Sequence, residues 1–110
     1  MDSTPNTSEL LVDDTRSWHF LTNHAHVLLC ISDNPDITVR ELAIRVQITE
    51  RAVMRIIGDL DDAGVIDRSR EGRRNHYTIH PEHQLRHPVE EHCSVGDLIR
   101  MFRGTASAKG

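Results

Sequence analysis

The chain is poor in aromatic residues and in cysteine, and it has no long apolar run. Aromatic residues make up 4% of its 110 residues: Trp18, Phe20, Tyr77 and Phe102. Two cysteines that lie far apart, Cys30 and Cys93, are a weak basis for a disulfide, so we expect free thiols in a reducing compartment. No apolar stretch approaches the ~20 residues that cross a bilayer, and the first residues show no signal-peptide pattern. We therefore predict a cytoplasmic protein with no membrane partner.

The sequence also lacks the patterns that enzymes use. It has no glycine-rich phosphate loop and no nucleophile elbow, and no acidic pair lies in a setting that would raise a pKa. We therefore predict that the protein is not an enzyme and has no catalytic residues and no cofactor. With 37% hydrophobic residues, the chain supports one small domain with a thin core.

Residues 38–60 contain two short segments with the apolar spacing of amphipathic helices. The apolar positions are Val39, Leu42, Ala43 and Val46 in the first segment, and Val53, Ile56, Ile57 and Leu60 in the second. Both sets follow the i, i+3, i+4, i+7 pattern that puts side chains on one face of a helix. We therefore expect two short helices, each of which buries one face.

Polar residues at the start of each segment are suitable helix caps. Thr38 and Glu41 have the spacing of a capping box, and Thr49 is a suitable N-cap for the second helix. Only Gln47 and Ile48 remain between the helices, so the helices must cross steeply, with Ile48 filling the angle. This arrangement is a predicted helix-turn-helix.

The second helix, predicted over about residues 50–63, keeps several positions outside its buried face. In its N-terminal half these are Thr49, Glu50, Arg51, Met54 and Arg55. Arginine reads guanine edges with two hydrogen bonds, and the N-terminal half of a recognition helix enters the major groove of DNA. All five residues are therefore candidate DNA contacts. In the alternative interpretation, both arginines lie on a solvated face and pair with Glu50 and Asp59.

A predicted β-hairpin follows the second helix. Gly64 suits the left-handed residue that ends a helix, and the strands are expected at residues 65–70 and 75–79, with the tip at residues 71–74. Tyr77 and Ile79 share one face of the second strand. Further candidate DNA contacts on the hairpin are Arg68, Arg70, Arg73, Arg74 and Asn75.

Together these segments resemble the winged helix-turn-helix transcription regulators of the MarR/ArsR-like kind. The resemblance extends over residues 18–102 and is carried by residues 41–43 (ELA), 48–53 (ITERAV), 62–64 (DAG) and 72–77 (GRRNHY). It implies a mainly α fold with a small β-hairpin (α+β) and a flanking terminal helix. One residue departs from the pattern, because Gln47 stands where many relatives have Gly, at a cost of about 1 kcal/mol if the residue is left-handed.

The resemblance also implies a function. It indicates sequence-specific binding of double-stranded DNA by a transcription regulator. Residues 50–63 would then occupy the major groove, and a basic wing at residues 68–75 would lie on the backbone or in the minor groove. The operator and any small-molecule effector cannot be named from the sequence.

The net charge of −4 comes mostly from the first residues. Residues 1–16 contain four acids against Arg16, a net −3, so the rest of the chain is close to neutral. Its arginines cluster on the predicted second helix and hairpin, whereas Asp59, Asp61 and Asp62 gather at the far end of that helix. A local basic patch suffices for DNA binding, although we expect only weak non-specific binding.

The flanks of the helix-turn-helix complete the expected organisation. We expect a disordered acidic tail at residues 1–17, the winged helix-turn-helix at residues 18–80, a linker and dimerisation helix at residues 81–103, and a disordered tail at residues 104–110. Within the second part, an almost wholly apolar scaffold helix should run from Thr22 or Asn23 to about Ser32.

The last helix is expected to begin after Ser94, with Asp97 as its capping-box partner, and to end near Phe102. Its apolar surface exceeds what a short terminal helix needs. We therefore predict that it packs on Trp18 and Phe20 and on its copy in a symmetric homodimer. The predicted interface is Trp18, Phe20, Leu98, Ile99, Met101 and Phe102. Two recognition helices about 34 Å apart would read an inverted-repeat operator.

Eight histidines raise the question of a metal site. His76, His80, His83 and His87 are spaced by three or four residues, but two prolines, Pro81 and Pro88, prevent one continuous helix there. The helix before the turn also lacks the Cys-x-Cys pair that metal sensors of the resembled kind carry. We predict no metal, with a zinc or nickel site built across subunits as the alternative.

The main alternative function is a winged-helix protein-protein interaction module without DNA binding, because a fold alone does not determine function. The hairpin tip favours DNA. Its adjacent Arg73 and Arg74 suit phosphates and suit an apolar protein interface poorly.

Overall fold

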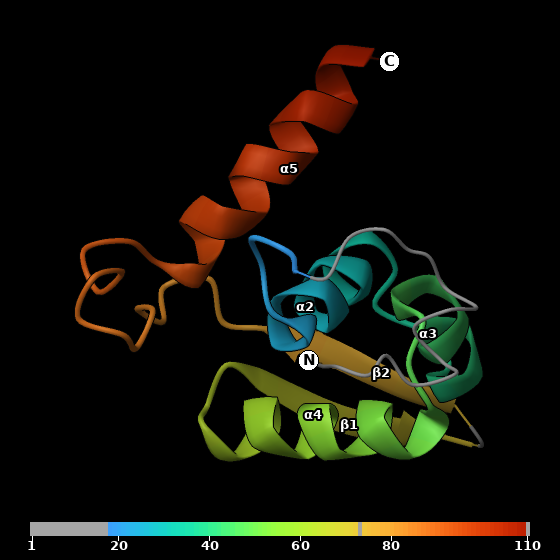
Figure 1. Ribbon diagram of the computed structural model, residues 1–110. Helices are drawn as coiled ribbons and strands as arrows, with labels where there is room; N and C mark the ends of the chain where they lie inside the picture. The colour runs from blue at the N-terminus through green and yellow to red at the C-terminus, as the bar shows by residue number, and fades with distance from the viewer. Residues whose placement is uncertain (1–17, 73, 110) are drawn as a thin grey trace, which may run out of the picture.

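In the part of the chain that the structure describes, three helices pack around a β-hairpin, and a long fourth helix projects from this body (Figure 1). The computed structural model describes residues 18–72 and 74–109, with side chains described as far as Arg103. The elements are α2 (Asn23–Asp33), α3 (Val39–Val46), α4 (Glu50–Asp62), β1 (Ile66–Glu71), β2 (Arg74–Ile79) and α5 (Val95–Lys109). The predicted class, mainly α with a small hairpin, is confirmed. The predicted acidic tail lies outside the described residues.

Helix α2 is the scaffold that contacts both α3 and α4. The hydroxyl of Thr22 accepts a hydrogen bond from the Ala25 N–H at 3.2 Å, which caps the helix at the predicted residue. The helix ends at Asp33, close to the predicted end, and the Asn34 N–H still donates to the carbonyl of Cys30. Its buried residues are Val27, Leu28, Cys30 and Ile31.

The turn between α3 and α4 is tight because Gln47 is left-handed, with φ 67° and ψ 46°. The N–H groups of Gln47 and Ile48 both donate to the carbonyl of Ala43, at 2.8 and 3.1 Å, and so end α3. Ile48 is half-buried and packs against the core, as predicted. The left-handed glutamine costs about 1 kcal/mol relative to glycine, which the packing of both helices offsets.

The predicted caps of α3 and α4 are formed. The Thr38 N–H donates to Oε1 of Glu41 at 2.9 Å, and the Glu41 N–H donates to the Thr38 hydroxyl at 3.1 Å. The hydroxyl of Thr49 accepts from the Ala52 N–H at 3.0 Å. Past the end of α4, Gly64 has φ 84°, the left-handed conformation that the sequence predicted for it. The predicted helix-turn-helix is confirmed.

The core is aliphatic, and among the described residues it contains no buried polar side chain. All four predicted positions of α4 are buried, but Leu42 is the only one of the α3 set that is, while Val39, Ala43 and Val46 are half-buried around it. Tyr77 is the aromatic residue in this core. Burying a side chain such as Leu42 stabilises the fold by about 1.5–3 kcal/mol. Both cysteines are free thiols, as predicted, and burial raises the pKa of Cys30.

The hairpin strands pair antiparallel from Ile66 and Ile79 at the base to Glu71 and Arg74 at the tip. The expected tip at residues 71–74 is therefore too long, because the pairing includes both of its outer residues, Glu71 and Arg74. Gly72 has φ 66°, a left-handed conformation that glycine adopts without strain.

Residues 80–94 form turns rather than a helix, as Pro81 and Pro88 predicted. An isolated β-bridge between Gln84 and Ser94 closes this segment. The Ser94 N–H then donates to Oδ2 of Asp97 at 2.9 Å, and the Asp97 N–H donates to Oγ of Ser94 at 3.1 Å. The predicted capping box of the last helix is therefore confirmed.

Helix α5 is longer than the sequence suggested. It continues to Lys109, so the predicted end near Phe102 is wrong. Alanine is the strongest helix former, and Ala106 and Ala108 offset the cost of about 1 kcal/mol at Gly104. None of the described helices is long and apolar enough to cross a membrane.

Candidate nucleic-acid interface

The outward face of α4 presents two arginines without acidic partners. Arg51 and Arg55 are separated by one helical turn and are exposed, and neither has a hydrogen bond or ion pair with any residue that the structure describes. Met54 lies on the same side of α4 and is 60% exposed. The opposite face of α4 is buried in the core. The helix therefore keeps one face for the fold and one face for a partner.

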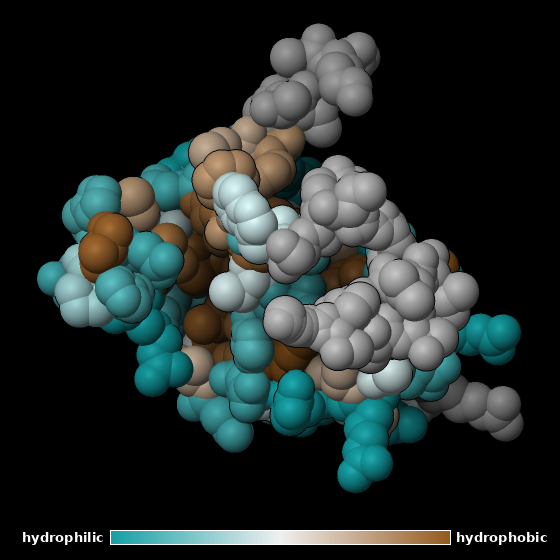
Figure 2. All heavy atoms as spheres, in the orientation of Figure 1, coloured by the Kyte–Doolittle hydropathy of each residue, from teal (hydrophilic) through white to brown (hydrophobic). Residues whose placement is uncertain are grey.

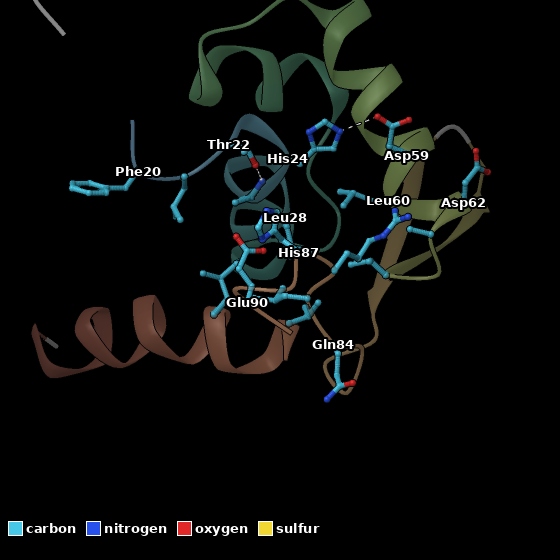
Figure 3. Close-up of a pocket in the computed structure, with 18 residues that line it drawn as sticks. Phe20, Thr22, His24, Leu28, Asp59, Leu60, Asp62, Gln84, His87 and Glu90 are labelled. Carbon is cyan, nitrogen blue, oxygen red and sulfur yellow. Dashed lines mark hydrogen bonds and ion pairs between the residues drawn. The ribbon is translucent and has the colours of Figure 1, made fainter. Parts of the chain in front are cut away.

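In the alternative interpretation Asp59 would pair with these arginines, but Asp59 has another partner. Oδ2 of Asp59 lies 2.8 Å from Nε2 of His24 (dashed line in Figure 3). Because a carboxylate only accepts hydrogen bonds, this nitrogen of His24 carries the proton. Glu50 forms no ion pair with the described residues, and the Thr49 hydroxyl is used as a cap. The alternative in which both arginines are neutralised on a solvated face does not match this geometry.

The charges of α4 are separated along the helix. The arginines lie in its N-terminal half, and Asp59, Asp61 and Asp62 lie in its last turns. The N-terminus of a helix also carries the positive end of the helix dipole. Both effects favour an anion such as a phosphate at the N-terminal end of α4 and disfavour one at the other end.

The register of the hairpin divides the wing residues between its two faces. Cross-strand partners share a face, and Arg68 pairs with Tyr77 while Arg70 pairs with Asn75. These side chains therefore lie on the face of the hairpin that carries core residues. Arg74 lies on the other face. The remaining candidate, in the turn at residue 73, is outside the described residues.

Two of the candidate wing residues already have partners within the protein. Arg68 donates from Nε and Nη2 to Oδ2 of Asp61, at 3.3 and 3.2 Å, which ties β1 to the end of α4. Nδ2 of Asn75 donates to Oη of Tyr77 at 3.3 Å, and Asn75 is half-buried. Arg70 is exposed and has no partner among the described residues. On β1, Arg70 is thus the side chain most available to a phosphate.

Two further arginines lie near the start of α3: Arg74 in β2 and Arg40 in α3 itself. Arg74 is exposed, and its Nη1 donates to the carbonyl of Asp36 at 3.1 Å, so most of its guanidinium donors are free. Arg40 was not among the sequence candidates. It is exposed in the first turn of α3 and has no partner among the described residues. The first helix of a helix-turn-helix crosses the DNA backbone, so the polar position beside Val39 could have been identified.

A cleft of about 980 Å³ lies at the C-terminal end of α4. Leu28, Leu60 and Leu98 line it, and Figure 2 shows apolar surface in the hollow below α5. His87 and Glu90, from the segment after the hairpin, also line it (Figure 3). The cleft and the outward arginines therefore occupy opposite ends of α4.

Four histidines, one in β2 and three after it, have separate partners instead of a common one. The pairs are His76 with Asp36 at 2.7 Å, His80 with Asp67 at 2.8 Å, His83 with the Gln84 carbonyl at 3.0 Å, and His87 with the Val89 N–H at 3.1 Å. In the described ranges, no three His, Cys, Asp or Glu side chains are grouped as metal ligands. The expectation that no metal is needed stays a prediction.

The predicted dimer residues separate into an exposed group and a packed group. Trp18 and Phe20 contact each other edge to face with ring centroids 4.9 Å apart, and Phe20 is 91% exposed. Phe102 and Met101 are exposed as well. Leu98 and Ile99, by contrast, are half-buried against the core of their own subunit, because they lie at the base of α5 before it projects (Figure 1). Helix α5 therefore leaves Phe20 uncovered in the single subunit, and the predicted interface between two subunits stays a prediction.

Comparison with known families identifies the domain. Residues 22–67 match the family model for winged helix-turn-helix DNA-binding domains. These residues, 46 of the 110, are similar to winged helix-turn-helix DNA-binding domains. The match begins at the cap of α2 and ends in β1, so it includes the arginines of α4. The predicted family resemblance is confirmed at this level.

Solved structures share the fold of this winged helix-turn-helix protein. A MarR family transcription regulator is 22% identical, with a TM-score of 0.52 over 79% of this chain and 52% of that one. A MarR protein from Peptoclostridium difficile is 16% identical, with a TM-score of 0.54 over 79% of this chain and 51% of that one. At such identities the likeness concerns the fold, and the chain spans about half the length of these proteins. These comparisons show that the chain has the winged-helix fold.

One curated relative is an enzyme, but the match is partial. A riboflavin kinase from Thermococcus kodakarensis is 41% identical over 46 residues, which are 42% of this chain and 22% of that enzyme. So small a share of the kinase does not carry its activity to this chain.

Proposed function

We propose that the protein is a cytoplasmic transcription regulator that reads double-stranded DNA with the N-terminal half of α4. The carrying observation is the pair Arg51 and Arg55, exposed and without acidic partners on a helix whose other face is in the core. Guanidiniums one turn apart can each donate two hydrogen bonds to a guanine edge in the major groove. Thr49, Glu50 and Met54 are proposed to complete the base-contacting surface.

The wing is proposed to contact the DNA backbone or minor groove. Arg70 and Arg74 are exposed, and the wing turn adds Arg73. Arg68 and Asn75, which have partners within the protein, are proposed to act from the edge of this surface or after rearrangement. These contacts would position α4 on the duplex without reading its sequence, because phosphate contacts carry no base information.

We further propose that two chains bind an inverted-repeat operator as a homodimer. Support comes from the exposed aromatic side chains of Trp18, Phe20 and Phe102, which lie in the flanks and not on the DNA-facing helices. Leu98 and Ile99 would contribute through the base of α5, and Met101 through its exposed face. A two-fold dimer would place two recognition helices in successive major grooves about 34 Å apart.

Two alternatives are weaker. A riboflavin kinase activity lacks support, since the shared 46 residues are a small part of that enzyme. A protein-protein interaction module would require an apolar surface on α4 or the wing, yet the exposed side chains there are polar or charged apart from Met54. We therefore favour DNA binding without catalysis.

Selection of bound sequences from random duplex DNA tests this proposal. The wild-type chain should enrich an inverted repeat, and the double variant Arg51→Ala/Arg55→Ala should lose the preference while keeping its thermal midpoint. Arg86→Ala, which removes an exposed arginine at the cleft, is the matched control and should enrich the same sequence. The absence of any enriched sequence with the wild-type chain would disprove the proposed function.

A further inference from the structure

The loop between α2 and α3 is a rigid support beside the wing. Oδ1 of Asn34 accepts a hydrogen bond from the Asp36 N–H at 3.1 Å, and the Ile37 N–H donates to the Asn34 carbonyl at 3.0 Å. The next side chain, Ile37, is 3% exposed and belongs to the core. Thr38 then caps α3. Asp36 is therefore held from both sides by a turn and by a buried residue.

The outer half of the wing, by contrast, has little support from the core. In β1 only Ile66 is buried, and in β2 only Tyr77 is. The residues from there to the tip are exposed or half-buried, and a hairpin of two strands alone is at best marginally stable in water. Contacts outside the core must therefore help to hold the wing relative to α4.

Three contacts join β2 to the rigid loop. The Tyr77 N–H donates to the carbonyl of Pro35 at 3.0 Å. Nδ1 of His76 lies 2.7 Å from Oδ1 of Asp36. Nη1 of Arg74 donates to the main-chain carbonyl of Asp36 at 3.1 Å. Two of the three contacts converge on Asp36.

We propose that Asp36 is a positioning residue for DNA binding. It holds the wing, and with it the Arg74 guanidinium, where the wing can contact the same duplex as the recognition helix. This inference rests on the proposed function. Asp36 acts through His76: its carboxylate accepts a hydrogen bond from the Nδ1–H of His76 and so fixes the strand position from which Arg74 extends. One guanidinium N–H of Arg74 is used by the Asp36 carbonyl, and the others remain for a phosphate oxygen.

The charge of Asp36 allows a clear test, because charge repulsion and positioning predict opposite changes in DNA affinity when Asp36 is replaced. A carboxylate near a surface that meets phosphates opposes binding by repulsion, so its removal should tighten binding if charge alone matters. A positioning residue behaves in the opposite way. Its removal weakens binding even though the protein becomes less acidic.

The test compares Asp36→Ala with Glu71→Ala on the duplex selected by the wild-type chain. Glu71 is a matched control because it is an exposed wing acid with no partner among the described residues. We expect Asp36→Ala to weaken binding about fivefold and to reduce the salt slope by about one, since one phosphate contact is lost. Glu71→Ala should bind as tightly as wild type or tighter. The thermal midpoint of each variant is measured alongside.

Two more variants separate positioning from folding. Asp36→Asn keeps an oxygen acceptor for His76 without the charge, so it should restore most of the affinity lost in Asp36→Ala. His76→Ala should weaken binding as Asp36→Ala does, and the double variant should be no worse than either single one, because both remove the same contact. The loss should occur at temperatures where each variant is fully folded.

The outcomes distinguish this inference from the proposed function. If Asp36→Ala and His76→Ala bind as tightly as Glu71→Ala, Asp36 has no positioning role, while the effect of Arg51 and Arg55 still stands. If the wild-type chain binds no duplex, both proposals fail together. If Asp36→Asn is as weak as Asp36→Ala, the acceptor role of the side chain is wrong.

Discussion

Nε2 of His24, at the start of α2, lies 2.8 Å from Oδ2 of Asp59 in α4. Asp59 follows Arg55 by four residues, the spacing at which an acid and an arginine pair along a helix. Because Asp59 is held by His24, the guanidinium of Arg55 remains free of an acidic partner among the described residues. A contact on the scaffold helix thus affects which charges the recognition helix presents.

The first prediction concerns Arg55 and His24 together. Replacing Arg55 with Ala should cost about 1–3 kcal/mol on the selected duplex and relax the preference at one base pair. His24→Ala should weaken binding by a smaller factor, about twofold, because Asp59 is then free to pair with Arg55. Fluorescence anisotropy measures both. In the Arg55→Ala background, His24→Ala should have no further effect. A twofold loss of affinity in that background as well would contradict this coupling.

The second prediction concerns the wing arginines. Replacing both Arg73 and Arg74 with Ala should weaken binding to all duplexes alike and reduce the salt slope by about one to two, since phosphate contacts are lost. The ratio of affinities for selected and unrelated duplexes should barely change. Arg86→Ala, at the opposite end of the domain, should leave the slope unchanged. A double variant that retains the wild-type slope would show that the wing does not touch the backbone.

The third prediction concerns acid stability. The hydrogen bond from the Thr38 N–H lowers the pKa of Glu41 below its ordinary value of 4.5, helped by the Thr38 hydroxyl and the charge of Arg74. A lowered folded-state pKa means that the ionised form is stabilised by folding, so this stability is present above pH 4.5 and is lost as the pH falls below it. Glu41→Gln should therefore reduce the decrease in thermal midpoint between neutral and acidic pH. An unchanged pH profile would contradict the capping-box contribution.

The fourth prediction is that neither folding nor DNA binding needs a metal. His76, His80, His83 and His87 each have their own partner, and within the described residues no group of three metal-ligating side chains occurs. Chelator should leave the thermal midpoint and the affinity for the selected duplex unchanged. One tightly held zinc ion per purified chain, found by elemental analysis, would overturn this expectation.

The fifth prediction concerns the homodimer. Phe102→Glu puts a charge on an exposed apolar side chain of α5 and should convert a dimer to a monomer, measured by light scattering after size exclusion at micromolar concentration. Val89→Glu is the matched control, because Val89 is a similarly exposed apolar residue in the segment after the hairpin. Leu98 is unsuitable for this test because it packs in its own subunit. A wild-type mass of one chain would rule out the dimer at that concentration.

Local patterns were sufficient to predict the helix-turn-helix. The caps at Thr38, Thr49 and Ser94 satisfy N–H groups within three residues, so they depend on nearby side chains and not on the rest of the fold. The left-handed Gly64 follows from equally local geometry. The end of α5 was predicted too early. In its last residues the helix cost of a glycine is offset by the helix preference of alanine, and the glycine was given too much weight.

The tertiary structure decided which charged side chains are available. The apolar spacing of α4 was enough to predict that Arg51 and Arg55 face outward, because the 3.6-residue period of the helix puts Val53 and Ile56 on the buried side. It could not show that His24 holds Asp59, because these residues are 35 positions apart and meet only when α2 packs on α4.

The same limit applies to the wing. The basic hairpin after α4 could be predicted from the sequence, since the turn residues and the alternating strand pattern are local properties. Only the strand register decided that Arg70 and Arg74 lie on opposite faces, and only packing against the α2–α3 loop brought Asp36 to His76, 40 positions away. Long-range contacts of this kind depend on how elements pack as rigid bodies, which no local pattern encodes.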